Sequence, residues 1–226
     1  MGATIFGYDK IVGMDRLLEM AMKRGKAMGE HYYTKNPSVK SDRNRIAEEL
    51  RGSRFQFTTD SGVFSKKEVD FGSKLLIETF EEPEIEGDIV DVGCGYGPIG
   101  ISLASEFSNR RFYLLDVNER ATELAMNNAI KNGVNNLSVM ASDQLSAVKD
   151  KTFASVVTNP PIRAGKQVVH GILEEAHHVL EKGGTLWVVI QKKQGAPSAI
   201  NKLEEMFQHV ETVVKKKGYY ILKAVK

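Results

Sequence analysis

The sequence contains a single cysteine and no long hydrophobic segment. Cys94 is the only cysteine among 226 residues, which excludes an internal disulfide bond and any metal cluster built from several cysteines. No window reaches the ~18 uninterrupted apolar residues of a membrane-spanning helix, and the N-terminus lacks the apolar core of a signal peptide. We therefore expect a cytoplasmic protein with no membrane partner.

The sequence also lacks a strong excess of either charge. Its 31 Lys and Arg residues nearly balance its 29 Asp and Glu residues, which leaves a net charge of +2. This excess is too small to indicate nucleic-acid binding by itself. The hydrophobic content of 42% is enough for one sizeable core. Strand-like and helix-like segments alternate regularly, which predicts a single α/β domain.

A glycine-rich turn is the first functional motif. Residues 89–100 read IVDVGCGYGPIG, an apolar strand that runs into the turn. Gly93, Gly95 and Gly97 permit a tight turn and close approach of a ligand to the backbone, and Pro98 suits the first turn of a following helix. The G-x-G-x-x-G pattern within this run is a weak signal when taken alone. With the preceding strand, the turn predicts a nucleotide-like cofactor.

Polar side chains also mark the ends of the strands that follow. Strand 111–116 ends at Asp116, 25 residues after Asp91, where a carboxylate suits a pair of ribose hydroxyls. A strand near residues 137–140 leads to Ser142 and Asp143, and a strand at 154–157 leads to Asn159. The carboxyl ends of parallel strands share one edge of a sheet, so we expect these side chains to line one site.

The motif Asn159-Pro160-Pro161 indicates the chemistry of that site. Neither proline can continue a strand or helix, and each fixes φ near about −65°, so the Asn159 amide is held on a stiff backbone. The Asn159 oxygen and the Pro160 carbonyl could each accept one N–H of an amino group. As an isolated tripeptide the motif is more often a simple turn. The glycine-rich strand upstream favours the functional interpretation.

These motifs together resemble a known family. Asp91 through Gly97, then Asp116, Asp143 and Asn159-Pro160-Pro161, are similar to the successive motifs of class I S-adenosylmethionine-dependent methyltransferases of the Asn-Pro-Pro subgroup. Three further segments resemble the ribosomal RNA guanine-N2 methyltransferases, specifically the catalytic half of the small-subunit enzyme. They are residues 58–65, 191–196 and 215–219.

The resemblance implies a fold and an activity. The fold would be a seven-stranded, mostly parallel Rossmann-like sheet with helices on both faces. The segment 219–225 should be its antiparallel strand, because the link from residue 215 to 218 is too short for a parallel crossover. The activity would be transfer of the methyl group of S-adenosylmethionine to the exocyclic N2 amine of a guanine in small-subunit 16S ribosomal RNA. The partner would be that RNA or the ribosomal subunit, and no metal is required.

The resemblance also implies roles for individual residues. The catalytic residues would be Asn159, Pro160 and Pro161. The cofactor-binding residues would be Phe64, Asp91, Gly93, Cys94, Gly95, Gly97, Asp116, Val117, Ser142, Asp143 and Asn159. Cys94 lies between two glycines, where a small residue fits beneath the cofactor, and nothing near it in sequence would activate it as a nucleophile.

Two lysine clusters are expected at the same edge as the site. Lys192 and Lys193 follow a strand at 186–191, and Lys215, Lys216 and Lys217 follow a strand near 210–214. Either cluster alone is more often a solvated loop, but two clusters on one edge favour phosphate contacts. With Arg163, these five lysines are the predicted RNA-binding residues.

Other segments give local predictions. Ser65 and Glu68 match a capping box that would open a helix through Phe80, and the loop before it, with Phe64, would fold over the methionine end of the cofactor. Trp187 is expected in the core. The helix 166–180 places three histidines and a glutamate on one face, but nothing nearby completes a metal site. These four residues are His170, Glu174, His177 and His178.

Alternative functions remain open. Asn-Pro-Pro enzymes that act on adenine N6 or on protein glutamine usually have an aromatic residue next, whereas this sequence has Ile162. The alternatives are a methyltransferase for adenine N6 or glutamine, an inactive RNA-binding module and, less well supported, a nicotinamide-dependent dehydrogenase, which would leave the Asn-Pro-Pro motif unexplained.

The N-terminus has its own hypothesis. We expect residues 1–30 to form an extension that need not be native, and residues 31–226 to form the methyltransferase domain. Lys23-Arg24-Gly25 is what a purine-rich ribosome-binding site would encode, about two codons upstream of Met28. The hypothesis is therefore that Met28 is the physiological start and that residues 1–27 are translated leader. The alternative is a helical extension, because Met14, Leu17, Leu18 and Met22 would share one helix face.

Overall fold

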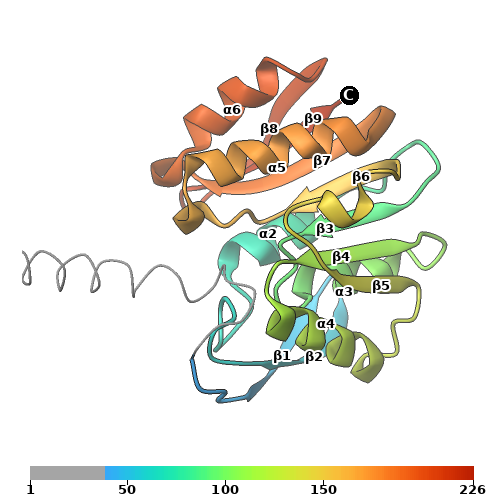
Figure 1. Cartoon of the computed structure of the whole chain (residues 1–226), viewed down its shortest axis with the longest axis vertical. Helices are drawn as coiled ribbons and strands as arrows, with labels where there is room; N and C mark the ends of the chain where they lie inside the picture. The colour runs from blue at the N-terminus through green and yellow to red at the C-terminus, as the bar shows by residue number, and fades with distance from the viewer. Residues whose placement is uncertain (1–38) are drawn as a thin grey trace, which may run out of the picture.

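A seven-stranded sheet forms the centre of the molecule (Figure 1). The computed structural model describes residues 39–226, so the predictions for residues 1–30 and for Met28 lie outside the described residues. The strand order is β5-β4-β3-β6-β7-β9-β8. The strands are β3 (Ile89–Val92), β4 (Phe112–Asp116), β5 (Leu137–Ala141), β6 (Phe153–Thr158), β7 (Leu180–Gln191), β8 (His209–Lys216) and β9 (Tyr219–Val225).

The sheet is parallel except for β9, as the sequence predicted. Strands β5, β4, β3, β6 and β7 pair in parallel, whereas β9 pairs antiparallel with both β7 and β8. The link between β8 and β9 is only Lys217 and Gly218, which have φ values of 50° and 79°. Two residues with positive φ form the tight turn of a β-hairpin. This hairpin brings the end of β8 to the edge of the sheet at which β7 ends.

Helices cover both faces of the sheet, as expected. On one face α2 (Phe71–Thr79), α3 (Pro98–Glu106) and α4 (Glu119–Lys131) bury Ile89, Leu114 and Trp187. On the other face α5 (Lys166–Val179) and α6 (Ala196–Glu204) bury the alternate strand residues, such as Val90 and Leu186. Period-two alternation thus sends neighbouring residues of each strand into opposite cores. The prediction that Trp187 is a core residue is confirmed, because none of its surface is exposed.

A hairpin that the sequence did not predict precedes the sheet. β1 (Asn44–Leu50) and β2 (Ser53–Thr59) pair antiparallel and bury Phe55 and Phe57 against the helices α2 to α4. Two asparagines, Asn128 within α4 and Asn132 at its C-cap, bind the outer edge of β2. The Asn132 amide accepts from the Gln56 N–H and donates to the Gln56 carbonyl, both at 2.9 Å. Asn128 does the same at Thr58, at 2.7 and 3.0 Å.

The predicted capping box is wrong. Helix α2 begins at Phe71, and its N-cap is Asp70, whose carboxylate accepts from the backbone N–H groups of Gly72 at 2.9 Å and Ser73 at 3.1 Å. Ser65 has a positive φ of 56°, and its hydroxyl donates to the Glu68 carbonyl instead. Both residues can cap a helix. Asp70 is the cap here because the helix begins at Phe71, directly after it.

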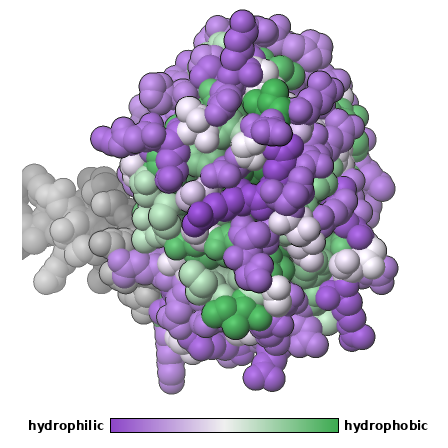
Figure 2. Space-filling view, turned by 90° about the vertical axis from the view of Figure 1, so that its right-hand side faces the viewer, coloured by the Kyte–Doolittle hydropathy of each residue, from purple (hydrophilic) through white to green (hydrophobic). Residues whose placement is uncertain are grey.

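The described surface is largely polar. Among residues 39–226, no helix is both long and apolar enough to cross a membrane. The face shown in Figure 2 is mainly hydrophilic, and its hydrophobic side chains occur in small, scattered groups.

Candidate active site

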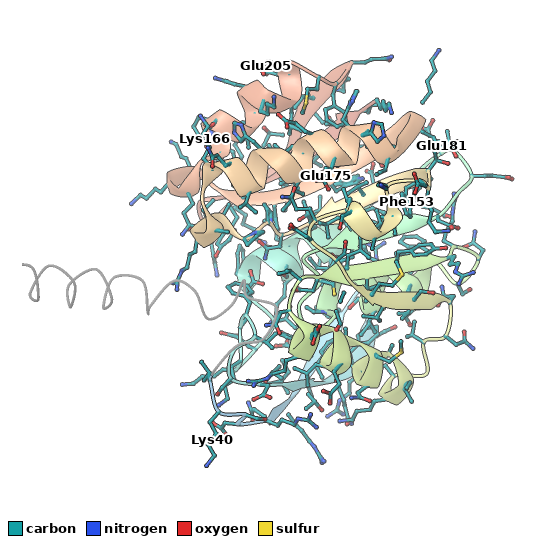
Figure 3. All side chains as sticks on the ribbon, in the orientation of Figure 1. Lys40, Phe153, Lys166, Glu175, Glu181 and Glu205 are labelled. Carbon is teal, nitrogen blue, oxygen red and sulfur yellow. The ribbon has the colours of Figure 1, made fainter. Side chains whose placement is uncertain are left out.

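The predicted site residues gather where the parallel strands end. In Figure 3 β6 starts near the labelled Phe153 and ends on the left, the side on which Lys166 begins α5. The labelled Glu181, near the start of β7, lies on the opposite side. The carboxyl edge of a parallel sheet is the usual ligand-binding edge of this architecture.

The glycine turn offers an open stretch of backbone. Gly93 and Gly95 have φ values of 74° and 58°. A β-carbon at Gly93 would meet nothing within 4 Å, and one at Gly95 would only touch Val63 at 4.0 Å. A ligand can therefore approach the backbone closely at both residues. Gly97 differs, because a β-carbon there would lie 2.6 Å from the Ile101 side chain, so its lack of a side chain also serves packing.

Asp91 is fully buried beside this turn. Its Oδ2 accepts a hydrogen bond from the Gly100 N–H at 2.9 Å, and its Oδ1 has no partner among the described residues. Burial raises the pKa of Asp91 to about 7, against the lowering effect of the Gly100 hydrogen bond. Asp91 is the third of the four residues of β3, which ends at Val92. A buried acceptor without a partner suits a cationic amino group of a ligand.

Asp116 ends β4, as predicted, but its carboxylate already has backbone partners. Oδ2 accepts from the Gly95 N–H and Oδ1 accepts from the Asn118 N–H, both at 2.9 Å. Burial raises its pKa, although both hydrogen bonds act in the opposite direction. Each carboxylate oxygen has a second lone pair that a hydroxyl can use. Val117, the next residue, lies half-buried at the same edge.

Of the two predicted site residues after β5, Ser142 has a structural role and Asp143 is exposed. The buried Ser142 hydroxyl donates to the Gln144 carbonyl at 2.9 Å and accepts from the Ala147 N–H at 3.1 Å, so this side chain builds the turn. The Ser142 N–H donates to the Asp116 carbonyl at 2.9 Å, which holds the ends of β4 and β5 together. Asp143 is exposed at this edge. The cofactor roles of both residues stay predictions.

Asn159 lies at the end of β6 with its amide in one defined orientation. Its Nδ2 donates to the Ser73 hydroxyl at 2.9 Å and lies 3.4 Å from both carboxylate oxygens of Asp70. Among residues 39–226, no hydrogen bond engages its Oδ1 or the carbonyl of Pro160. The Pro161 carbonyl, in contrast, accepts from the Ala164 N–H. The motif thus has two acceptors, Asn159 Oδ1 and the Pro160 carbonyl, without a hydrogen-bond partner among the described residues.

Sequence reasoning missed Asp70 and Ser73, the partners of Asn159. They precede it by 89 and 86 residues, so no local pattern connects them. It also missed Asn118, which caps α4 and whose amide donates to the Gly62 carbonyl at 2.9 Å. This bond anchors the loop that carries Phe64. Phe64 itself is 55% exposed, so its contact with the cofactor remains a prediction.

The two lysine clusters do lie together. The Lys192 N–H donates to the Gly218 carbonyl at 2.8 Å, which joins the segment after β7 to the hairpin turn after β8. The Lys217 ammonium lies 4.8 Å from the ring centroid of Phe71, and that ring stacks at a tilt on Tyr219 at 5.5 Å. All six predicted RNA-binding residues are exposed. They are Arg163, Lys192, Lys193, Lys215, Lys216 and Lys217.

The geometry around Cys94 and the histidines points to structural roles. Burial raises the pKa of the Cys94 thiol well above its ordinary value, which keeps it a neutral thiol. His170 bonds with the Ser198 hydroxyl at 3.1 Å and His177 packs edge-on against Phe207, so both tie α5 to neighbouring segments. Within the described part of the chain, no three His, Cys, Asp or Glu side chains are arranged to hold a metal ion.

Comparison with known proteins identifies the family. The model of the methyltransferase small domain family matches residues 54–223. The chain belongs to this family. An uncharacterized protein of Bacillus subtilis, YbxB, is 62% identical to this methyltransferase over 200 residues, which cover 88% of the chain and the whole of that protein.

Two further relatives are named for an activity. Ribosomal RNA small subunit methyltransferase C of Citrobacter koseri is 31% identical over 185 residues, which cover 78% of this methyltransferase and 51% of that protein. The structure of the T. thermophilus 16S rRNA N2 methyltransferase RsmC, in complex with AdoMet and guanosine, aligns with a TM-score of 0.74 and 26% identity. That alignment covers 84% of this chain and 52% of the other. This methyltransferase thus spans about half the length of these two relatives.

The methyl donor of this methyltransferase is S-adenosylmethionine, and the site fits it. The open backbone at Gly93 and Gly95 leaves room for the ligand. The unpartnered Asp91 Oδ1 suits an amino group, and the Asp116 carboxylate suits hydroxyls. These features match the methionine and ribose parts of the cofactor.

Proposed function

We propose that this methyltransferase modifies the exocyclic N2 amine of a guanine in small-subunit ribosomal RNA. The observation that carries the proposal is that two successive acceptors just after β6, Asn159 Oδ1 and the Pro160 carbonyl, have no hydrogen-bond partner among the described residues. An exocyclic amine has two N–H donors, and one can go to each acceptor. Its lone pair would then project away from both.

The chain's contribution to catalysis is mostly positioning. S-adenosylmethionine supplies an electrophilic methyl group when it is bound. The lone pair of the target amine is delocalised into the base, and hydrogen bonds to Asn159 and Pro160 localise it as the nitrogen becomes pyramidal. These two bonds would contribute about 2–4 kcal/mol to transition-state stabilisation. The methylated amine loses its proton readily, so no strong general base is needed.

The residues proposed to bind the cofactor lie at the same edge of the sheet. We propose that Gly93, Gly95 and Cys94 line the cofactor along the glycine turn, Asp91 binds its amino group and Asp116 its ribose. Val117 and Asp143 would border the adenine, with Phe64 over the methionine end.

The choice of guanine in ribosomal RNA draws on the relatives and on the charged edge. Two of the relatives are named as small-subunit ribosomal RNA methyltransferases, and the structure of one of them holds guanosine. The five exposed lysines and Arg163 give this edge the positive charge that phosphate contacts need. A base in a duplex would have to be flipped out, at a cost of a few kcal/mol.

We also propose a replacement for the aromatic residue missing at Ile162. Phe71 and Tyr219 form a half-buried aromatic pair, and Phe71 directly follows Asp70, a neighbour of Asn159. Aromatic rings bind unstacked bases by stacking, at roughly 1–3 kcal/mol per base. We infer that this pair contributes the stacking surface of the base site.

The deciding experiment identifies the methylated product. The protein is incubated with labelled S-adenosylmethionine and, in parallel, naked 16S RNA, small ribosomal subunits and a release-factor protein. The RNA is then digested to nucleosides. We expect label in N2-methylguanosine, and the same nucleoside should be missing at one site in ribosomal RNA from a deletion strain. Label in N6-methyladenosine or in the protein would establish one of the other methyltransferase functions. No transfer, despite cofactor binding, would support the inactive module.

A further inference from the structure

We propose that Asp70 and Ser73, at the start of α2, are positioning residues that fix the orientation of the Asn159 amide. They hold Nδ2 against the helix and thereby turn Oδ1 toward the methyl acceptor. The inference rests on the proposed function for the identity of that acceptor, but the orientation itself is a property of the protein alone.

The atoms that contact the Asn159 Nδ2 can all accept a hydrogen bond. The Ser73 hydroxyl lies at 2.9 Å and both Asp70 carboxylate oxygens lie at 3.4 Å. Ser73 is buried and Asp70 is half-buried, so water competes weakly for these contacts. An amide nitrogen has two N–H groups, enough to serve the hydroxyl and the carboxylate together.

Asp70 and Ser73 do not contribute equally to the orientation of the Asn159 amide. A serine hydroxyl can donate or accept, so Ser73 would tolerate either end of the Asn159 amide. An ionised carboxylate can only accept. If the amide were turned over, Oδ1 would face the Asp70 carboxylate, and two acceptors would repel each other. Asp70 therefore sets the orientation, and Ser73 adds the shorter hydrogen bond.

Asp70 is itself held firmly. Its Oδ1 accepts from the Gly72 and Ser73 N–H groups as the N-cap of α2. A carboxylate is favoured at a helix N-terminus. Gly72 packs against Tyr219 so closely that a β-carbon would lie 2.8 Å from the ring, which fixes this turn of α2 against β9.

The arrangement also explains why an amide rather than a carboxylate stands at residue 159. An aspartate there would offer a stronger acceptor to the amine, yet it would face Asp70 across the same gap. Hydrogen bonding of Nδ2 to a carboxylate instead polarises the amide and strengthens Oδ1 as an acceptor, without a second charge.

A charge exchange between the two residues tests the proposal. Asp70→Asn, Asn159→Asp and the double variant are compared with wild type in rRNA methylation. In Asp70→Asn the new amide favours the turned-over Asn159, so kcat should fall about 10- to 100-fold. The helix stays capped, because asparagine caps as well as aspartate, and KM and S-adenosylhomocysteine affinity should stay within about threefold.

In the double variant the amide introduced at residue 70 can donate to the carboxylate introduced at residue 159. Its kcat should therefore exceed that of Asn159→Asp at least about tenfold.

Two control variants distinguish loss of the Asn159 orientation from general damage to the fold. Glu68→Gln removes a neighbouring exposed carboxylate, and Ser102→Ala removes a buried helical hydroxyl that bonds only to the Pro98 carbonyl. Both should keep the wild-type kcat, whereas Ser73→Ala should lower kcat. Full activity of Asp70→Asn, or a double variant no better than Asn159→Asp, would overturn the proposal.

A second measurement does not depend on the substrate. The side-chain amide protons of Asn159, observed by NMR in the 15N-labelled full chain, should exchange with water about tenfold faster in Ser73→Ala than in wild type, as expected for loss of one hydrogen bond. Equal exchange rates would overturn the positioning role. If ribosomal RNA is not methylated but the exchange rates differ as expected, the proposed substrate is wrong and the orientation stands.

Discussion

The carboxylate of Asp116 accepts a hydrogen bond from the Gly95 N–H at 2.9 Å, so the end of β4 is tied to the glycine turn that follows β3. The same carboxylate accepts from the Asn118 N–H, at the start of α4. One side chain thus links two elements of the cofactor site, and its loss should affect both the ribose contact and the shape of the turn.

We expect Asp116→Ala to weaken S-adenosylmethionine binding by roughly 1.5–3 kcal/mol, because a charged acceptor for the ribose hydroxyls is lost. Isothermal titration calorimetry with the cofactor measures this directly. Asp143→Ala is the comparison, and should act in the same direction more mildly because Asp143 is exposed. An unchanged affinity in Asp116→Ala would remove this residue from the cofactor site.

Asn159→Ala should abolish most turnover while cofactor affinity stays within several-fold. The reason is that we propose the Asn159 Oδ1 as an acceptor for the incoming amine, and Asp91 and the glycine turn as the contacts of the cofactor. Single-turnover kinetics and calorimetry on the same preparation separate the two effects. Equal losses of rate and affinity would instead show that Asn159 is a cofactor ligand.

Replacing the five lysines at residues 192, 193, 215, 216 and 217 by alanine should weaken RNA binding and flatten its salt dependence, because fewer counterions are released. Cofactor affinity should not change. The matched control is Lys131→Ala with Lys182→Ala, two exposed lysines on α4 and at the start of β7, away from the carboxyl edge. A salt slope equal to that of the control would assign the clusters to solvated loops.

The raised pKa of Asp91 predicts a pH dependence of stability. A carboxyl whose pKa is raised to about 7 in the folded chain binds its proton more tightly there than in the unfolded chain. Its contribution to stability is therefore greatest at low pH and falls as the pH rises from about 4 to about 7. Between pH 5 and pH 8, the cofactor-free protein should lose roughly 1–3 kcal/mol of unfolding free energy relative to Asp91→Asn.

Urea unfolding of both proteins at each pH measures this difference. The comparison cancels the titration of His170 and His177, which both proteins share. Parallel pH profiles for wild type and Asp91→Asn would contradict the prediction. Because an ionised Asp91 should bind the amino group better, cofactor affinity should also rise through the same pH range in wild type only.

The elements predicted correctly are those whose signal is local. Buried strands such as Phe153–Thr158 are predominantly apolar, and the antiparallel direction of β9 followed from a link too short for a crossover. The hairpin of β1 and β2 was missed because most residues of β1 are exposed, so its alternation is weak. In β2 the alternation of Phe55, Phe57 and Thr59 was there to be seen.

The site was predictable only in part, because some of its contacts join segments that are far apart in the sequence. Asp91, Asp116 and Asn159 could be found from local sequence, since each lies within or just after a predominantly apolar strand segment. The contact of Asn159 with Asp70 depends on how α2 packs beside β6, and no periodicity reports that. The choice of Asp70 over Ser65 as the helix cap likewise depends on tertiary contacts that both local patterns leave open.

The two asparagines that bind β2 also affect whether the hairpin can pair with a strand of another molecule. Asn128 and Asn132 occupy the backbone N–H and C=O groups of Thr58 and Gln56 that a further strand would use. A strand with unsatisfied backbone groups is a template for pairing with another chain, and so for aggregation. Two side chains on one helix therefore close this edge of the hairpin to intermolecular strand addition.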